Sequence, residues 1–417
     1  MGLKSFFFKE EDDDKDTNQL VGFKFYEIII IILIAILIGL VSGLHIGSYY
    51  AEKSLEKEKK TETQDPSLNQ LSTISDWISD NYFEKISKEE LLEAAIEGMI
   101  DYVGDPHTSY LTPQEKKDFD ERMGGEYRGI GIELTSDKEE KNIFIINVFP
   151  NSPAATAGLQ VGDIIIAVDK KETKKMTTAE IASYIKEGKS KKVDITVKRE
   201  KKTLTKTVDK KKVTIPSVET EMFKENNKKI GYIFISLFAN NTYEQFRRAV
   251  LDFEDEKIDS LIIDVRSNSG GYLNSVVEMM SMFLPKDSII YQIKVQDNIK
   301  KHYTKTKEYR DYPVVVLINE YSASASEILA GAFKEVYKAE IVGKTSFGKG
   351  SVQETRNLEN GGMLKITTQS WLTPLGNSIE GKGIEPTIEV DLGKEYLNNP
   401  SSENDNQLQK AIEILKK

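Results

Sequence analysis

The chain has 417 residues and a formal net charge of -10, with 57 Lys and Arg against 67 Asp and Glu. Its length predicts more than one domain, and its net negative charge argues against a nucleic-acid binder, which needs a concentrated basic face. It contains no cysteine, which excludes disulfides, thiolate nucleophiles and cysteine-ligated metals, and its only histidines are His45, His107 and His302.

An apolar stretch near the start, residues 28–44, contains no charged residue and is long enough to cross a bilayer. We therefore predict a transmembrane anchor over residues 25–50, between a short tail over residues 1–24 and a linker over 51–68. A cleaved signal peptide is the alternative. Lysines flank the apolar stretch on both sides, so the positive-inside rule does not decide its orientation.

Two periodicities follow the linker. Apolar residues recur at helical spacing and predict a helical segment over residues 69–123. Short glycine-punctuated strands then begin, with the blocks EYRGIGIELTS and SPAATAGLQVGDIIIAVD. These blocks resemble a PDZ domain, which we place at residues 124–209. In such a domain a peptide adds to the open sheet edge, and backbone N–H groups of one loop bind its terminal carboxylate. The resemblance assigns this loop to Arg128, Gly129, Ile130, Gly131 and Ile132.

From residue 210 to 395, strands alternate with helices. The apolar stretches at 230–238, 261–265 and 314–318 predict strands, and amphipathic helices lie between them. This alternation predicts an α/β domain whose largely parallel sheet is covered on both faces. A last helix is expected within residues 396–417.

The stretch GKTSFGKGS, residues 343–351, nearly matches a phosphate-binding loop. Such a loop must open a helix, whereas the residues after Lys349 predict two strands joined by a turn at 360–362. Gly350 also stands where a Ser or Thr should bind magnesium. Nucleotide binding is therefore the weaker interpretation.

Serines crowd the junction between a buried strand and a helix in the stretch YSASASEILAGA. A hydroxyl at a helix N-terminus lies beside unsatisfied amides that favour an oxyanion, although serines are also ordinary helix caps. A lysine could serve as its base only if its pKa fell by roughly three units, a cost of about 4 kcal/mol. The uncharged neighbours of Lys349, namely Phe347, Gly348, Gly350 and Val352, suit such burial.

Together with DPHTSYLTP, DVRSNSGGYL and the PDZ blocks, the stretches YSASASEILAGA and IVGKTSFGKGSVQ resemble the C-terminal processing peptidases, which are tail-specific serine proteases. The resemblance covers about residues 70–395. It implies a catalytic core related to the crotonase/ClpP fold, Ser324 as nucleophile, Lys349 as general base and Gln353 as the residue that orients the lysine. It also implies an oxyanion hole from backbone N–H groups of Ala325 and of Gly270 or Gly271.

The sequence departs from the family pattern at three places near these residues. Ser269 replaces the proline of the usual Asn-Pro-Gly-Gly turn, Tyr321 stands where glycine is common, and Ser267 stands where asparagine is frequent. His107 is matched by the family outside its active site, so we expect it to order a loop. His302 lies in a polar stretch and is expected at the surface.

We therefore predict a membrane-anchored serine endopeptidase whose PDZ domain captures the C-terminal tails of protein substrates. The resemblance implies that the catalytic part is extracytoplasmic and that the short tail of residues 1–24 is cytoplasmic. No metal, nucleotide or other cofactor is needed. The expected partners are proteins or peptides with accessible C-termini, and the membrane through one helix. A homo-oligomer is compatible with the sequence. The alternative is a catalytically inactive PDZ scaffold at the membrane.

Overall fold

The computed structural model describes residues 66–137, 142–306 and 309–417. The predicted tail, the anchor and nearly all of the linker lie outside this part of the chain. Among the described residues, no helix is both long and apolar enough to cross a bilayer. The chain divides into two compact units, residues 1–93 and 94–417.

The segment predicted to be helical contains three helices and one strand. They are α2 (Pro66–Asn81), α3 (Lys88–Val103), β1 (Ser109–Leu111) and α4 (Pro113–Gly124). Helix α4 begins at a capping box, in which Thr112 and Glu115 satisfy each other's backbone N–H groups, and ends at left-handed Gly125. Strand β1 is short and was not predicted, because it forms only by pairing antiparallel with the distant strand β18 (Met363–Leu372).

The glycine-punctuated region forms a small β-rich domain with its own core. Its sheet has the order β3-β4-β5-β7-β8, with β6 paired to β5, and β2 pairs separately with β9. The core centres on Ile145, Ile165, Ile181 and Ile195, all at most 2% exposed. The elements are β2 (Glu126–Gly129), β3 (Ile132–Ser136), β4 (Ile143–Val148), α5 (Pro153–Ala157), β5 (Ile164–Val168), β6 (Lys171–Glu172), α6 (Thr178–Glu187), β7 (Lys192–Arg199), β8 (Lys202–Asp209) and β9 (Lys211–Thr214).

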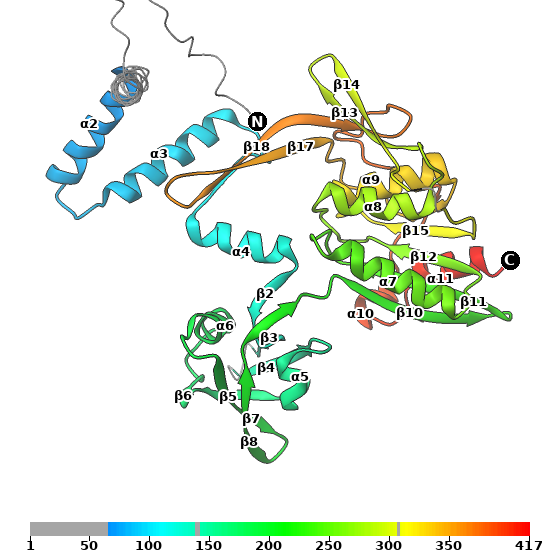
Figure 1. Ribbon diagram of the computed structural model, residues 1–417, viewed down its shortest axis with the longest axis horizontal. Helices are drawn as coiled ribbons and strands as arrows, with labels where there is room; N and C mark the ends of the chain where they lie inside the picture. Colours follow the sequence, from blue (N-terminus) through cyan, green and yellow to red (C-terminus); the bar gives the residue numbers. More distant parts are fainter. Residues whose placement is uncertain (1–65, 138–141, 307–308) are drawn as a thin grey trace, which may run out of the picture. The chain divides into compact units, whose positions relative to one another are not determined.

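The following region is an α/β domain around a six-stranded sheet in the order β10-β11-β12-β15-β16-β19 (Figure 1). Only β10 runs antiparallel to its neighbour; the other pairs are parallel. The strands are β10 (Val218–Glu225), β11 (Lys228–Ile235), β12 (Ser260–Asp264), β15 (Val314–Ile318), β16 (Glu340–Gly343) and β19 (Ile388–Glu389). The predicted α/β domain is confirmed.

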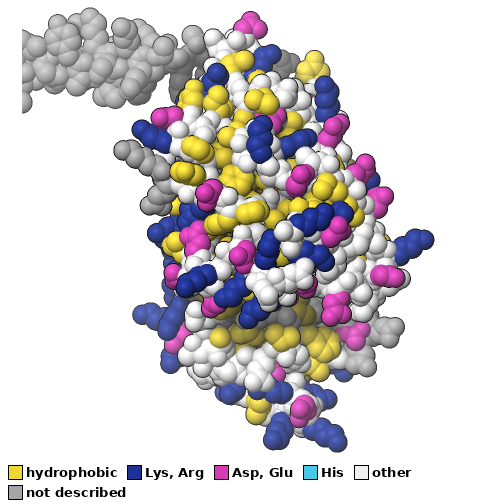
Figure 2. Space-filling view, turned by 90° about the vertical axis from the view of Figure 1, so that its right-hand side faces the viewer, with side chains coloured by type: hydrophobic (Ala, Val, Ile, Leu, Met, Phe, Trp, Pro, Cys, Tyr) yellow, Lys and Arg dark blue, Asp and Glu magenta, His cyan; other side chains and the backbone are white. Residues whose placement is uncertain are grey.

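Helices cover both faces of this sheet, as the continuous apolar strands predict. One face packs against α7 (Thr242–Asp255), α8 (Leu273–Phe283) and α9 (Ala325–Ala332), which continues as the π-helical turn η1 (Phe333–Tyr337). The other face packs against α11 (Asn406–Leu415), the expected last helix, which follows the short α10 (Lys394–Asn398). Figure 2 shows one face of the molecular surface, on which acidic and basic side chains are intermixed.

A second sheet carries the residues that follow Lys349. It has the order β1-β18-β13-β14, with β17 (Ser351–Asn357) also paired to β18; the others are β13 (Ile289–Val295) and β14 (Asn298–Tyr303). Strands β17 and β18 form the predicted hairpin around residues 360–362. Because Lys349 leads into a strand and not a helix, the segment lacks the helix N-terminus that a phosphate loop requires.

Candidate active site

Three neighbouring parallel strands bring the predicted site residues together. The loops after β12, β15 and β16 carry Gly270, Ser324 and Lys349 respectively, and these strands are adjacent in the sheet. The carboxyl ends of parallel strands meet at one edge, which is where open α/β sheets place their sites. Sheet topology therefore explains how residues far apart in sequence reach one place.

Ser324 is the residue immediately before α9, and its backbone is in an unusual conformation. Its φ of 54° lies in the left-handed region that non-glycine residues rarely adopt, and such strain is often found at functional sites. The serines on either side have structural roles: Ser322 Oγ donates to Val265 O at 2.8 Å, and Ser326 Oγ donates to Asn268 O at 2.8 Å. These two bonds fix the turn that presents Ser324.

The carboxylate of Glu327, which is 0% exposed, joins the serine turn to the lysine loop. Its Oε2 accepts the N–H of Ser324 at 2.7 Å and that of Lys349 at 3.0 Å. Its Oε1 accepts Ser346 Oγ and the N–H of Gly348, each at 2.6 Å. Burial raises the pKa of Glu327, while these donors act to lower it. The sequence analysis missed this residue, although the S-x-x-E spacing of a capping box could have indicated it.

Lys349 is held by its backbone and half-buried at its side chain. Its carbonyl accepts Trp371 Nε1–H at 2.8 Å, in addition to the bond from its own N–H to Glu327. Burial lowers the pKa of the Lys349 ammonium, and repulsion from Lys365 lowers it further. The charges of Asp105, Glu327 and Glu380 act in the opposite direction. The lowered pKa is the property that the sequence analysis required of a lysine base.

Within the described ranges Lys349 forms no salt bridge, whereas Lys344 in the same loop forms two. Lys344 Nζ lies 2.7 Å from Glu389 and 2.9 Å from Asp391. The hydrogen bonds that the Lys344 ammonium donates to these carboxylates raise its pKa. The lysine that lowers the pKa of Lys349 is Lys365, on β18, and not Lys344, which is closer in sequence.

A loop from the N-terminal segment approaches Lys349. Burial acts to raise the pKa of Asp105, but hydrogen bonds from Thr108, Thr367 and the N–H of His107 lower it to about 2. Thr108 Oγ1 in turn accepts the N–H of Thr367, on β18, at 3.2 Å. Burial and the charge of Lys349 lower the pKa of His107. His107 thus lies in a loop ordered by Asp105, and near Lys349.

His302 is elsewhere and is not simply exposed, contrary to expectation. It is half-buried on β14, and its ring stacks on Tyr291 with centroids 4.4 Å apart. Burial lowers the pKa of His302. A polar sequence context failed to predict this because the neighbouring strand supplies the aromatic partner.

Gln353 lies on β17, four positions after Lys349. Its Nε2 donates to Ser351 Oγ at 2.9 Å and to Thr367 Oγ1 at 3.1 Å. In the part of the chain that the structure describes, no side-chain hydrogen bond joins Ser324, Lys349 and Gln353 to one another. Ser324 and Lys349 are instead connected through their N–H groups by Glu327.

Of the two glycines of the predicted oxyanion hole, Gly270 lies against the serine turn and Gly271 against the backbone of Phe238. Both have positive φ, 104° for Gly270 and 141° for Gly271. A Cβ on Gly270 would lie 2.9 Å from Ser324 Cβ and 3.1 Å from the backbone nitrogen of Ala325. Gly270 donates its own N–H to Asn268 Oδ1 at 2.8 Å. Buried Asn268 also donates to Ile235 O at 2.8 Å, so its side chain braces the turn in which Ser269 replaces proline.

The predicted peptide loop borders a groove of about 400 Å³ between β3 and α6. The lining is mainly apolar, with charged side chains of Glu121, Glu133 and Lys186. Lys186 forms a salt bridge of 2.5 Å with Glu121. Of the five predicted loop residues, Gly129, Ile130 and Ile132 line the groove directly, while the side chain of Arg128 is exposed outside it.

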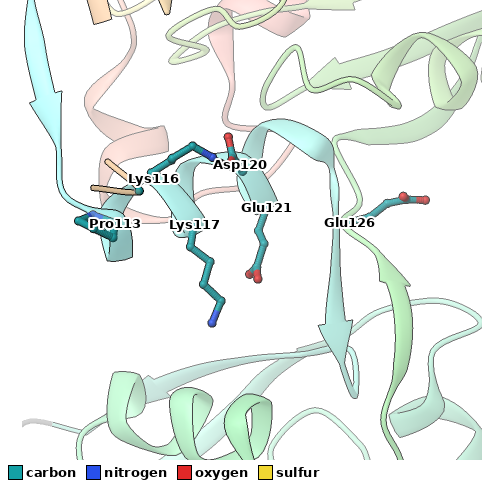
Figure 3. A pocket seen from close by; sticks show the side chains of 7 residues that line it. Pro113, Lys116, Lys117, Asp120, Glu121 and Glu126 are labelled. Carbon is teal, nitrogen blue, oxygen red and sulfur yellow. Dashed lines mark hydrogen bonds and ion pairs between the residues drawn. The ribbon is translucent and has the colours of Figure 1, made fainter. Parts of the chain in front are cut away.

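A separate hollow of about 360 Å³ lies over α4 and is charged (Figure 3). Lys116 and Asp120 pair with each other there, and Lys117, Glu121 and Glu126 add to its lining. Ser324, Lys349 and Gly270 are not among its lining residues, so we do not assign the reaction to this hollow.

The structure has the two components expected of a PDZ-containing serine peptidase. One is a β-rich domain with a groove, and the other is an α/β domain in which a strained serine and a half-buried lysine share one site. Comparison with known families agrees: peptidase family S41 matches residues 229–390, the PDZ domain family matches 119–198, and the N-terminal domain of the activating protease CtpB matches 41–115.

Individual relatives extend the similarity over most of the chain. The carboxy-terminal processing protease CtpB of Bacillus subtilis is 38% identical over 330 residues, which are 78% of this chain and 68% of that protein. A CtpA-like serine protease of Staphylococcus aureus is 33% identical over 335 residues, 80% of this chain and 66% of that protein. An S41 protease structure from Bacteroides fragilis shares the fold, with a TM-score of 0.51 at 18% identity over 80% of this chain and 91% of that one.

The chain belongs to the C-terminal processing peptidases of peptidase family S41. It is a serine-type peptidase with a PDZ domain. The family and the class of enzyme predicted from the sequence are confirmed.

Proposed function

We propose that this peptidase is a membrane-anchored endopeptidase that captures C-terminal tails of protein substrates with its PDZ domain and cleaves them with Ser324 and Lys349. The observation that carries this proposal is the shared carboxylate of Glu327. It accepts the N–H groups of both residues, while the side chain of Lys349 is left without a carboxylate partner among the described residues and has a lowered pKa. A neutral lysine is what a general base requires.

In the proposed reaction, neutral Lys349 removes the proton of the Ser324 hydroxyl as Oγ forms a bond to the scissile carbonyl carbon. The C–N bond then breaks, and the leaving amine takes the proton from Lys349. Lys349 next removes a proton from water, which attacks the ester carbonyl carbon. The bond between this carbon and Ser324 Oγ then breaks, the acyl group leaves with a new carboxyl end, and Lys349 returns its proton to Ser324 Oγ. The side-chain contact between serine and lysine forms when substrate is bound, since catalytic hydrogen bonds tighten in the complex.

The oxyanion of each tetrahedral intermediate would accept two backbone N–H groups. Ala325 supplies one, at the N-terminus of α9 where the helix dipole also favours negative charge. The N–H of Gly270 is already donated to Asn268. We therefore assign the second donor to Gly271.

Gln353 would orient Lys349 through its carbonyl oxygen. Its Nε2 donates to Ser351 and Thr367, so the carbonyl oxygen is the end of the amide that can accept a hydrogen bond from Lys349. A neutral acceptor orients the amine without the charge that would raise its pKa.

The remaining assignments combine the length of the apolar stretch, which predicts the anchor, with the family resemblance, which implies the type of core and the location of the catalytic part. The core would be related to the crotonase/ClpP fold, and the domain limits would be those given by the sequence. Residues 25–50 would anchor the chain, with residues 1–24 cytoplasmic and the catalytic part extracytoplasmic.

Digestion of an unfolded, tailed protein by the full chain in detergent tests this function. Mass spectrometry should find cuts near the C-terminus with the wild type and none with Ser324→Ala. Blocking the substrate's C-terminal carboxylate as an amide should slow cleavage. A protein that binds tails without cutting would be the inactive scaffold, and cleavage that survives Ser324→Ala would refute the assignment of the nucleophile.

The repulsion between Lys365 and Lys349 leads to a prediction about pH. Activity should rise with pH as Lys349 loses its proton. Because Lys365 lowers the pKa of Lys349, Lys365→Met should raise that pKa and move the rising limb of kcat/KM to higher pH. Activity at neutral pH should then fall about tenfold for each pH unit of the shift and recover at alkaline pH. The exposed Lys117→Met is the control; a shift to lower pH would contradict the prediction.

A further inference from the structure

The loop of the PDZ groove is oriented so that its amides face outward. The carbonyl of Ile130 accepts the N–H of Ala154 at 2.8 Å, and that of Gly131 accepts the N–H of Phe149 at 3.0 Å and Ser152 Oγ at 3.3 Å. Since these carbonyls are bonded into the domain, the N–H groups of the loop are directed to the opposite side. This is the arrangement that binds a carboxylate.

These amides already have an acceptor from the chain itself. The N–H of Gly131 donates to the phenol oxygen of Tyr127 at 3.2 Å. Burial raises the pKa of the Tyr127 phenol, while the backbone N–H groups of Gly131 and Ile132 act to lower it. Tyr127 lines the groove and its side chain is half-buried. Its oxygen therefore occupies a position where a terminal carboxylate would accept the N–H of Gly131.

The surroundings of Gly129 show that the Tyr127 ring packs closely against the loop. A Cβ at this position would lie 2.3 Å from Cε2 of Tyr127. Gly129 does not have the positive φ that usually requires glycine, because it is absent from the left-handed residues of the described chain. The lack of a side chain at 129 thus makes room for the Tyr127 ring over the loop.

We propose that Tyr127 is an internal occupant of the carboxylate site and sets the affinity of the PDZ domain for substrate tails. The inference rests on the proposed role of this loop in tail binding. The carboxylate of a tail can bind only after the phenol oxygen has left the loop. The apparent affinity for tails is therefore reduced in proportion to the fraction of molecules in which Tyr127 is hydrogen-bonded to the loop. A carboxylate can do this because its charge-assisted bonds are about twice as strong as those of a neutral acceptor.

Tyr127→Phe tests the proposal because it removes the oxygen and keeps the ring. The probe is a short fluorescein-labelled peptide that ends in valine with a free carboxylate, chosen for the apolar lining of the groove. Binding is measured by anisotropy on the full chain in detergent, in a Ser324→Ala background that prevents cleavage. Loss of the neutral hydrogen bond from the free state should lower Kd about threefold to tenfold.

Two further variants make the result specific. Tyr184→Phe makes the same change on α6, where the ring lies beside Lys171 and not in the groove, and should leave Kd unchanged. Gly129→Ala should displace the ring with its hydroxyl retained, and should also lower Kd if thermal unfolding shows the variant to be folded.

Each outcome is decisive. A Kd that is unchanged or higher in Tyr127→Phe would overturn the proposal, since the hydroxyl would then be a spectator or a contact to the bound tail. The same peptide with its C-terminus amidated is measured in parallel. If it bound as tightly as the free carboxylate, or if neither the parent protein nor Tyr127→Phe bound the free peptide, the tail-binding role of the loop would be overturned and this inference with it.

Discussion

Lys349→Met should reduce kcat/KM at neutral pH by at least about a hundredfold and at the same time raise the melting temperature. The loss of activity follows from removal of the general base, which typically contributes 10²- to 10⁴-fold. The gain in stability follows from the lowered pKa of Lys349, which means that its protonated form is less favourable in the folded than in the unfolded chain. Methionine has a similar length and no charge to bury.

The sign of this stability change depends on pH. Below the folded-state pKa of Lys349 the lysine is protonated in both states, so the folded chain bears the whole cost. Between this pKa and the ordinary value the folded chain sheds the proton first, and stability rises with pH. The advantage of Lys349→Met should therefore be largest at neutral and acid pH, roughly 1–2 °C, and shrink at alkaline pH.

Lys344→Met provides a matched control in the same loop. Lys344 is paired with Glu389 and Asp391, and these partners raise its pKa, so its removal should lower stability slightly. It should leave the rising limb of activity in place. A decrease in melting temperature for both variants, or retention of activity in Lys349→Met, would contradict the assignment of Lys349 as a base kept neutral by burial.

Local sequence was sufficient for the elements whose signals are contiguous. The glycine-punctuated blocks predicted the PDZ domain, and the turn at residues 360–362 predicted the hairpin that argues against a phosphate loop. The serine cluster and the lysine motif identified the two residues that the structure brings onto one carboxylate.

The surroundings of Lys349 could not be predicted in this way, because they are assembled by pairing between distant strands. Lys365 reaches it on β18, which pairs with β17 directly after the lysine. Asp105 reaches it because β1 pairs with β18. Asp105 lies in the stretch DPHTSYLTP, which indicates the family but not that this residue comes near Lys349, and Lys365 lies in none of the quoted stretches. The pKa of Lys349 depends on both.

Glu327→Gln should reduce kcat by at least about a hundredfold and the free energy of unfolding by about 3 kcal/mol. The carboxylate accepts four hydrogen bonds, two at each oxygen. An amide has only one accepting oxygen, so its NH₂ group must face two donors. These are either the N–H groups of Ser324 and Lys349 or the hydroxyl of Ser346 and the N–H of Gly348. At a site that is 0% exposed, no water replaces the lost acceptor.

The loss of activity should exceed what the loss of stability explains, because the same carboxylate sets the relative position of the two reacting residues. The unfolding of Glu327→Gln by denaturant gives the stability term, and kcat is measured where the variant is fully folded. Glu335→Gln is the control: its carboxylate accepts Leu375 N at 2.7 Å and Asn377 Nδ2 at 3.2 Å at the surface, so little change is expected. If Glu327→Gln lost stability but kept its kcat, Glu327 would hold the fold of the loop without positioning Ser324 and Lys349 for the reaction.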